Sequence, residues 1–248
     1  MMKTIRLRIR RQEGPGKRPY WEEFSIPWQP GMNVVACLME IRKNPVNARG
    51  KATTPVVWES NCLEEVCGAC SMKVNGVARQ ACSALVDGLR QPIVLEPLSS
   101  FPVVRDLAVD RSAMFERLKK VQAWVEVDGS HPLGPGPRHS ENLQAFRYEL
   151  SRCMTCGVCL EACPNYHRRS PFMGPQPLAQ VLLFNLHPSG ALTGDRRLEA
   201  IMGPDGILGC GQAQNCVRSC PKGVPLTRAI SVLQGETVRY ALRRWASR

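Results

Sequence analysis

Residues 153–164 read Cys-Met-Thr-Cys-Gly-Val-Cys-Leu-Glu-Ala-Cys-Pro, and this stretch constrains the fold most strongly. The chain has 12 cysteines among 248 residues, and all but Cys37 fall in three clusters. Disulfide frameworks are typical of small secreted domains, whereas this chain is long and residues 1–10 lack the apolar core and cleavage site of a secretory signal. We therefore interpret the clusters as metal-binding sites.

The cysteines of residues 153–164 follow the spacing C-x2-C-x2-C-x3-C-P, which is typical of bacterial ferredoxins. In their two-cluster modules the fourth cysteine of each run binds the cluster of the other run. A partner run occurs at 210–221, Cys-Gly-Gln-Ala-Gln-Asn-Cys-Val-Arg-Ser-Cys-Pro, with Ala213 in place of the second cysteine. Because a methyl group cannot coordinate iron, one site should have four thiolates and the other three.

Because the fourth cysteine of each run binds the cluster of the other run, the two runs together predict the ligands of two clusters. The four-thiolate site, predicted to hold [4Fe–4S], consists of Cys153, Cys156, Cys159 and Cys220. The three-thiolate site, predicted to hold [3Fe–4S], consists of Cys163, Cys210 and Cys216. Fewer thiolates bring less negative charge, which should raise the reduction potential of the three-iron cluster and make it the terminal acceptor.

The remaining cysteine cluster reads Cys-Leu-Glu-Glu-Val-Cys-Gly-Ala-Cys at 62–70 and is followed by Cys82. This C-x4-C-x2-C…C spacing is typical of plant-type [2Fe–2S] ferredoxins. The alternative is a tetrahedral zinc site, which usually shows two close pairs, whereas the first and last cysteines here are single. We expect a [2Fe–2S] cluster bound by Cys62, Cys67, Cys70 and Cys82. Cys37 lies on an apolar helical face, and we interpret it as a buried hydrophobic residue.

The hydrophobic pattern predicts an α+β fold for the first part of the chain and helices for the second. Alternation and turn signals, including Asn75–Gly76, predict strands at 4–10, 22–26, 71–74, 77–81 and 93–95. A helix is predicted from Val34, ending before Pro45, and another from Ser112. Further helices are predicted at 141–151, 177–186, 196–202 and 226–244, after an irregular Gly- and Pro-rich segment at 128–139.

These elements predict three parts. We expect a plant-type (β-grasp) ferredoxin domain at 1–105, a linker with one helix at 106–140, and an all-α bacterial ferredoxin-like domain at 141–248, which holds the [4Fe–4S] and [3Fe–4S] clusters.

The formal net charge of +12 would suit a nucleic acid, an anionic lipid surface or an acidic partner subunit. No block of Lys and Arg with interleaved aromatic residues occurs, so we do not expect nucleic acid as a partner. A zinc-dependent nucleic-acid-binding protein is therefore the weaker hypothesis. No apolar run reaches the roughly 18–20 residues that a membrane-spanning helix needs, so membrane attachment should depend on a partner.

The sequence resembles the iron–sulfur subunit of succinate dehydrogenase and fumarate reductase over essentially its whole length. The resemblance depends on the cysteine runs at 62–70, 153–165 and 215–223, and it extends to Asn-Pro-Val-Asn-Ala at 44–48 and to Phe-Pro-Val-Val-Arg-Asp-Leu at 101–107. It is closest to the menaquinone-linked form of Gram-positive bacteria, judging by residues 133–138 and 210–216.

The resemblance implies a subunit of succinate dehydrogenase (quinone) that has no catalytic residue of its own. A flavoprotein partner with covalent FAD would carry out the dicarboxylate chemistry. Electrons would pass through [2Fe–2S], [4Fe–4S] and [3Fe–4S] to a quinone, expected to be menaquinone, at a membrane anchor cytochrome b subunit with haem b. The location implied is the cytoplasmic face of the bacterial cell membrane.

Two positions depart from the ubiquinone-using relatives, in which a Trp and a His help to bind the quinone. Arg168 and Gly211 occupy these positions here, so a quinone site beside the three-iron cluster would be differently built. His167 is a nearby candidate, although we expect it to be a surface residue, and Arg168 and Arg169 could face lipid phosphates or the anchor. The alternatives for function are a fumarate reductase subunit working in the reverse direction and a free multi-cluster electron carrier.

Overall fold

The computed structural model describes residues 3–126, 138–167 and 169–247. The chain divides into two compact units. The N-terminal unit comprises Met1–Arg111 together with Met154–Glu161, and the C-terminal unit comprises Ser112–Cys153 together with Ala162–Arg248. The domain boundaries predicted at 105 and 140 stay predictions.

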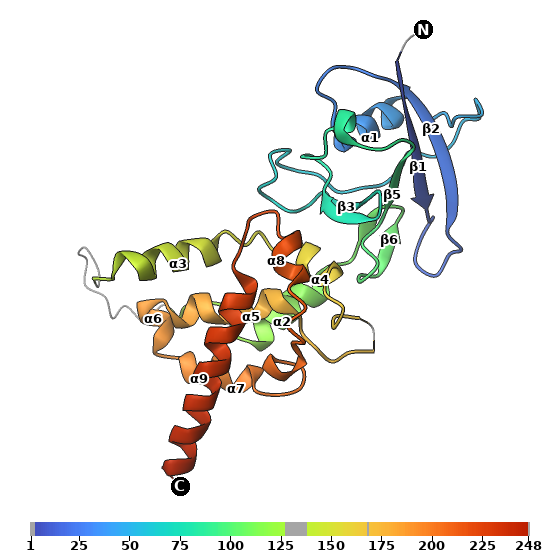
Figure 1. The fold of residues 1–248 in the computed structure, drawn as a ribbon. Coiled ribbons are helices and arrows are strands. Elements are labelled where there is room, and N and C mark those ends of the chain that lie inside the picture. Colours follow the sequence, from blue (N-terminus) through green and yellow to red (C-terminus); the bar gives the residue numbers. More distant parts are fainter. Residues whose placement is uncertain (1–2, 127–137, 168, 248) are drawn as a thin grey trace. The chain divides into compact units, whose positions relative to one another are not determined.

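The N-terminal unit is built on a five-stranded mixed sheet with the order β2-β1-β5-β3-β4 (Figure 1). Strand β1 (Thr4–Arg11) pairs antiparallel with β2 (Tyr20–Pro27) and parallel with β5 (Ile93–Glu96). Strand β3 (Ser71–Val74) pairs antiparallel with β5 and with β4 (Val77–Gln80). Every second side chain of β1 is buried, which is the period-two pattern that predicted this strand. All five predicted strands are confirmed.

Helix α1 (Val34–Lys43) completes the core of this unit. Its N-cap is Asn33, whose side chain accepts a hydrogen bond from the backbone N–H of Ala36 at 2.8 Å. Cys37 is fully buried in the shared core, and this burial raises the pKa of its thiol to about 12. The prediction that Cys37 is a buried hydrophobic residue is confirmed.

Short elements of the N-terminal unit were not predicted. Residues Val103–Arg105 and Ala108–Val109 form the two-stranded sheet β6–β7, and Val86–Gly88 form a 3-10 turn. Helix α4 (Val158–Glu161) lies in the cysteine-rich stretch and belongs to this unit. The strands and the 3-10 turn have only two or three residues, which is too short to show alternation, and the four residues of α4 make little more than one helical turn.

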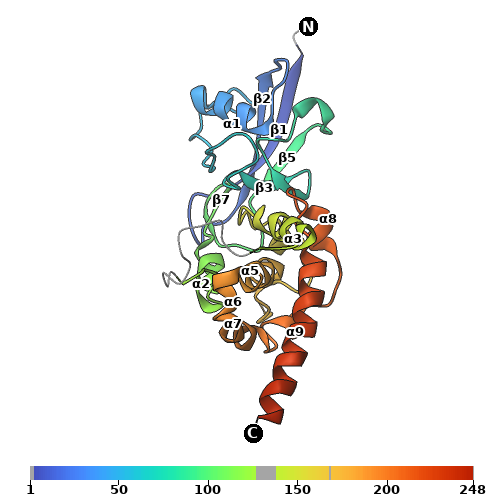
Figure 2. The same cartoon turned by 90° about the vertical axis from the view of Figure 1, so that its left-hand side faces the viewer.

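The described residues of the C-terminal unit form helices and no strand. The helices are α2 (Ser112–Lys120), α3 (Glu141–Ser151), α5 (Pro175–Asn185), α6 (Pro188–Ala191), α7 (Gly194–Ile201), α8 (Asn215–Ser219) and α9 (Leu226–Ala246), with a 3-10 turn at Ile207–Gly209. Helix α5 is central, because it contacts α2, α3, α6, α7 and α9 (Figure 2). The predicted helices are confirmed, whereas the short α6 and α8 were missed.

Local chemistry explains where α5 begins. Gly174 has a φ of 94°, a conformation that favours glycine, and Pro175 then occupies the first helical position, where its missing N–H costs nothing. The helix therefore starts two residues before the predicted 177. Most of the irregular segment predicted at 128–139 lies outside the described residues. No helix in the described parts of the chain is both long and apolar enough to cross a membrane.

Candidate metal centres

The loop at 62–70 surrounds the sulfur of Cys62 with hydrogen-bond donors. The Cys62 Sγ accepts from the backbone N–H groups of Glu64, Val66 and Cys67 at 3.4, 3.3 and 3.3 Å. Leu63, Glu65 and Gly68 have positive φ, at 61°, 56° and 75°, and these turns direct successive N–H groups toward the sulfur. The hydrogen bond from Glu64, followed by those from Val66 and Cys67, lowers the pKa of the Cys62 thiol to about 7. The loop is thus arranged to hold a thiolate.

The other two cysteines of the first predicted site flank the β3–β4 hairpin. Cys70 precedes β3 and Cys82 follows β4, and both are buried. The backbone N–H of Ala81 donates to the carbonyl of Cys70 at 3.1 Å, which extends the ladder and brings the two thiols within hydrogen-bond reach. Burial raises the pKa of the Cys70 thiol to about 12. The structure thus brings Cys62 close to Cys67 and Cys70 close to Cys82.

Three cysteines of the C-terminal unit line one open cavity of about 20 Å³. These are Cys163, Cys210 and Cys216, the three predicted to share a three-iron cluster. Ala213 also lines the cavity, between Gln212 and Gln214, which both have positive φ, at 53° and 60°. Burial raises the pKa of the Cys163 thiol, and it raises that of Cys216 to about 11, with smaller upward effects of the neighbouring thiols on both.

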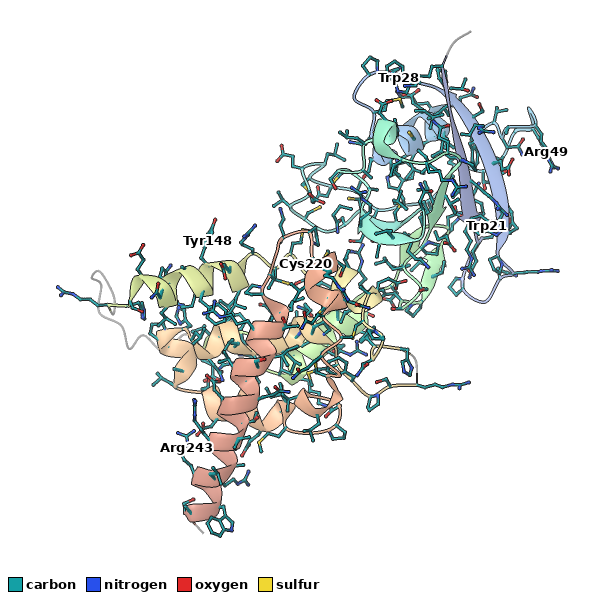
Figure 3. The ribbon with its side chains drawn as sticks, in the orientation of Figure 1. Trp21, Trp28, Arg49, Tyr148, Cys220 and Arg243 are labelled. Atoms are coloured by element: carbon teal, nitrogen blue, oxygen red, sulfur yellow. The ribbon has the colours of Figure 1, made fainter. Side chains whose placement is uncertain are left out.

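The four cysteines predicted to bind the four-iron cluster are divided between the units. In the N-terminal unit, Cys156 precedes α4 and Cys159 lies within it, and both are buried. In the C-terminal unit, Cys153 follows α3, and Cys220 follows α8 (Figure 3), where its Sγ accepts from the backbone N–H of Val224 at 3.4 Å. Across the described ranges, no group of three or more His, Cys, Asp or Glu side chains is placed to hold a single metal ion.

Arg111 supports the first cysteine loop, and sequence reasoning missed it. Its guanidinium donates hydrogen bonds to the carbonyls of Gly68 and Ala69, each at 2.8 Å, and pairs with Glu59. This arginine therefore holds the backbone between Cys67 and Cys70. It lies more than 40 positions from the loop, so no local spacing could have revealed it.

Glu161 also has a role that its sequence position does not reveal. Its carboxylate accepts hydrogen bonds from the backbone N–H groups of Ser99 and Ser100 and from the Ser99 hydroxyl. Burial raises the pKa of this carboxyl group, but the hydrogen bonds from the two serines outweigh burial and lower it. Glu161 lies between Cys159 and Cys163 in the cysteine run.

The positions considered for a quinone are exposed where they are described. His167 is exposed, as predicted, and its Nδ1 accepts from the backbone N–H of Arg169 at 3.3 Å. Gly211 is exposed, but a Cβ there would lie 2.8 Å from Nδ2 of Asn165. A larger side chain at 211 would therefore displace Asn165, which donates to the carbonyl of Gly209 at 2.8 Å. Arg168 lies outside the described residues.

Two family models match the chain. Residues 6–116 match a 2Fe-2S iron-sulfur cluster binding domain, and residues 149–224 match a 4Fe-4S dicluster domain. The first match contains the cysteines at 62–82, and the second contains those at 153–220. The predicted order, a 2Fe-2S domain followed by a 4Fe-4S domain, is confirmed.

Relatives match nearly the full length. The succinate dehydrogenase iron-sulfur subunit of Bacillus subtilis is 59% identical over 241 residues, which is 97% of this chain and 95% of the relative. The fumarate reductase iron-sulfur subunit of Wolinella succinogenes is 28% identical over 96% of this chain and 98% of the relative. The fumarate reductase iron-sulfur subunit of Mycobacterium tuberculosis is 33% identical over 74% of this chain and 75% of the relative.

A solved structure shares the fold. A chain of the Mycobacterium smegmatis Sdh1 complex in the apo form superposes with a TM-score of 0.78 at 19% identity, covering 99% of this chain and 98% of that one. At this identity the likeness shows the fold, and the 59% identity shows the family. The resemblance predicted from the cysteine runs is thereby confirmed, and the chain belongs to the family of succinate dehydrogenase and fumarate reductase iron–sulfur subunits.

Proposed function

We propose that the chain is the iron–sulfur electron-transfer subunit of a succinate:quinone oxidoreductase. The observation that carries the proposal is the 59% identity to a succinate dehydrogenase iron-sulfur subunit over 97% of the chain. Because the match is nearly complete, it includes both cluster-binding domains and their order along the chain. The dicarboxylate chemistry belongs to a partner, and this chain supplies the path for electrons.

The first group of ligands in this proposal holds a [2Fe–2S] cluster. Its members are Cys62, Cys67, Cys70 and Cys82. The donor set fits, because thiolates bind iron and N–H groups directed at the sulfurs tune a cluster's potential. The Cys62 sulfur already has three such donors, and the β3–β4 hairpin brings Cys82 to Cys70.

The second domain holds two clusters in this proposal. Cys153, Cys156, Cys159 and Cys220 would bind [4Fe–4S], and Cys163, Cys210 and Cys216 would bind [3Fe–4S]. The latter set is supported by the cavity that its three thiols line together with the methyl group of Ala213. When bound, each cluster accepts and releases one electron. The thiolates of this chain hold the clusters in sequence, and the methyl group of Ala213 supplies no ligand at the fourth position.

The partners in this proposal are a flavoprotein with FAD and a membrane anchor cytochrome b with haem b, where menaquinone is reduced. The chain would thus lie at the cytoplasmic face of the cell membrane. The solved chain that shares the fold comes from a complex, which supports the need for partners. The net charge of +12 suits an acidic partner or an anionic membrane surface.

Succinate oxidation is the favoured direction. The succinate dehydrogenase relative is 59% identical, whereas the fumarate reductase relatives are 28% and 33% identical. The reverse reaction, fumarate reduction, is the second candidate, because the same parts serve both directions.

The test is to purify the tagged chain from host membranes. We expect it to copurify in equal amounts with a flavoprotein and a haem-containing anchor. Addition of succinate should then reduce the clusters, as followed by EPR spectroscopy. A free, single-chain carrier in the soluble fraction, or a colourless zinc protein without acid-labile sulfide, would refute the proposal.

A further inference from the structure

A short piece of the second cysteine run belongs to the N-terminal unit. The chain enters this unit at Met154 and leaves it after Glu161, while the residues on either side belong to the C-terminal unit. The piece contains Cys156 and Cys159, and its helix α4 contacts strand β4. We call residues 154–161 the docked segment. Two contacts within the N-terminal unit, one near each end of the segment, hold it in place.

The first contact joins the docked segment to the loop at 62–70. Gly68 has a φ of 75°, and a Cβ on it would lie 2.8 Å from Cβ and 3.0 Å from Cα of Cys156, and 3.1 Å from the carbonyl oxygen of Met154. Glycine is thus required twice here, for its conformation and for the close approach. The backbone of one cysteine loop therefore packs directly on a cysteine of the other.

The second contact is the carboxylate of Glu161. One carboxylate oxygen accepts from the backbone N–H of Ser99 at 3.0 Å and from the Ser99 hydroxyl, and the other accepts from the backbone N–H of Ser100 at 2.8 Å. Charge-assisted hydrogen bonds of this kind are stronger and more directional than neutral ones. Both carboxylate oxygens are engaged, so the end of α4 is fixed in position and in orientation.

We propose that Glu161 is a positioning residue that, together with the Gly68 contact, sets the separation between the first two clusters. This inference depends on the proposed function, because it takes Cys67 and Cys70 as ligands of [2Fe–2S] and Cys156 and Cys159 as ligands of [4Fe–4S]. Electron transfer between two clusters falls exponentially with their separation, so a small displacement of the docked segment changes the rate. The Glu161 carboxylate acts on the clusters through α4.

The test is Glu161→Gln in the purified, cluster-loaded complex. An amide nitrogen cannot accept a hydrogen bond, so one of the two serine N–H groups would face another donor. Glu161→Asp keeps both acceptor oxygens and serves as the conservative variant. Glu40→Gln is the matched control, because Glu40 lies in the same unit and its substitution removes the same charge. In the described part of the chain its carboxylate forms one ion pair, with the exposed Lys43 at 2.6 Å.

The readout is microwave power saturation of the reduced [2Fe–2S] EPR signal, which relaxes faster when the neighbouring [4Fe–4S] is reduced and close. We expect this enhancement to fall several-fold in E161Q, to recover in part in E161D and to equal wild type in E40Q. A role in stability alone would lower the unfolding midpoint and leave the enhancement unchanged. An unchanged enhancement in E161Q with both signals present overturns the inference, as does an equal fall in E40Q.

The test also has a defined result if E161Q fails to assemble one or more clusters. Selective loss of [4Fe–4S] in E161Q, with the other two signals intact, also supports the positioning role, because the docked segment carries two of its ligands. If E161Q loses every cluster, Ser99→Ala, which removes one of the three donors, is measured against the same criteria. Failure of the proposed function would look different, because the wild-type complex itself would then lack the [2Fe–2S] or [4Fe–4S] signal.

Discussion

Arg11→Met perturbs the network that supports the approach to the first cysteine loop. Arg11 ends β1 with only 1% of its surface exposed. Its guanidinium donates to Asp106 at 2.9 Å, to Glu22 at 2.5 Å, and to the carbonyl and the hydroxyl of Thr54, each at 3.0 Å. These contacts tie the end of the sheet to the chain that leads to Cys62. Methionine retains much of the volume but none of the donors.

The structure indicates how far Arg11→Met should lower the free energy of unfolding. Removing one partner of a buried ion pair costs about 3–5 kcal/mol, because the remaining charge is left buried without compensation. Asp106, also 1% exposed, would retain the hydrogen bonds from the N–H groups of Gln12 and Val57, at 3.0 and 2.9 Å. We therefore expect Arg11→Met to lower the free energy of unfolding by about 3 kcal/mol, the lower end of this range.

The neighbouring residue offers a matched control. Arg10 lies on the same strand, but its side chain is 41% exposed and its nearest contact with Glu96 is 3.8 Å. Arg10→Met should therefore cost only about 0–1 kcal/mol. Urea unfolding of both variants of the loaded protein, followed by circular dichroism and by cluster absorbance, gives the comparison. If Arg11→Met destabilises the protein no more than Arg10→Met, the reasoning about the buried network is wrong.

Three further predictions concern single side chains. Ala213→Cys should convert the three-iron site to [4Fe–4S], because it adds a thiol to the wall of the cavity that the three cysteines line. An unchanged [3Fe–4S] EPR signal would contradict the assignment of Ala213 to the position of the missing ligand. Cys82→Ala should perturb only the [2Fe–2S] signal, and loss of the [3Fe–4S] signal with [2Fe–2S] intact would contradict the ligand assignment. Glu236→Gln should raise the unfolding midpoint at pH 7, because burial raises the pKa of Glu236, an effect that outweighs the hydrogen bond from Asn185. A carboxyl group whose pKa is raised by folding stabilises the protein below its unfolded pKa of about 4.3, and this contribution is lost as pH rises through the folded pKa. The gain in the unfolding midpoint should therefore be present at pH 7 and vanish at about pH 4.3. An equal gain at these two pH values would contradict the prediction.

The sequence predicted the elements whose signals are local. Asn75–Gly76 gave the hairpin because both residues adopt positive φ, at 50° and 81°. The helix predicted at 141–151 has these bounds in the structure, where Ser140 caps it by accepting a hydrogen bond from the backbone N–H of Leu143. The cysteine spacing predicted the family, since cluster geometry fixes the number of residues between ligands.

The sequence could not predict features that depend on distant parts of the chain. The hydrogen bonds of Glu161 join residues about 60 positions apart, and those of Arg111 join residues more than 40 positions apart. The cysteine run at 153–163 looks like one unit in sequence, yet residues 154–161 pack with the N-terminal unit. Only the tertiary fold shows that Cys156 leaves no room for a side chain at Gly68.

The most direct test of the central claim is an iron and acid-labile sulfide analysis of the purified chain, combined with an EPR-monitored redox titration. The account predicts three separate cluster signals and one more sulfide than iron per chain, because only [3Fe–4S] contains fewer irons than sulfides. Of the three, the three-iron cluster should be reduced at a higher potential than its four-thiolate neighbour. Equal iron and sulfide with no three-iron signal, or zinc in place of iron, would contradict the account.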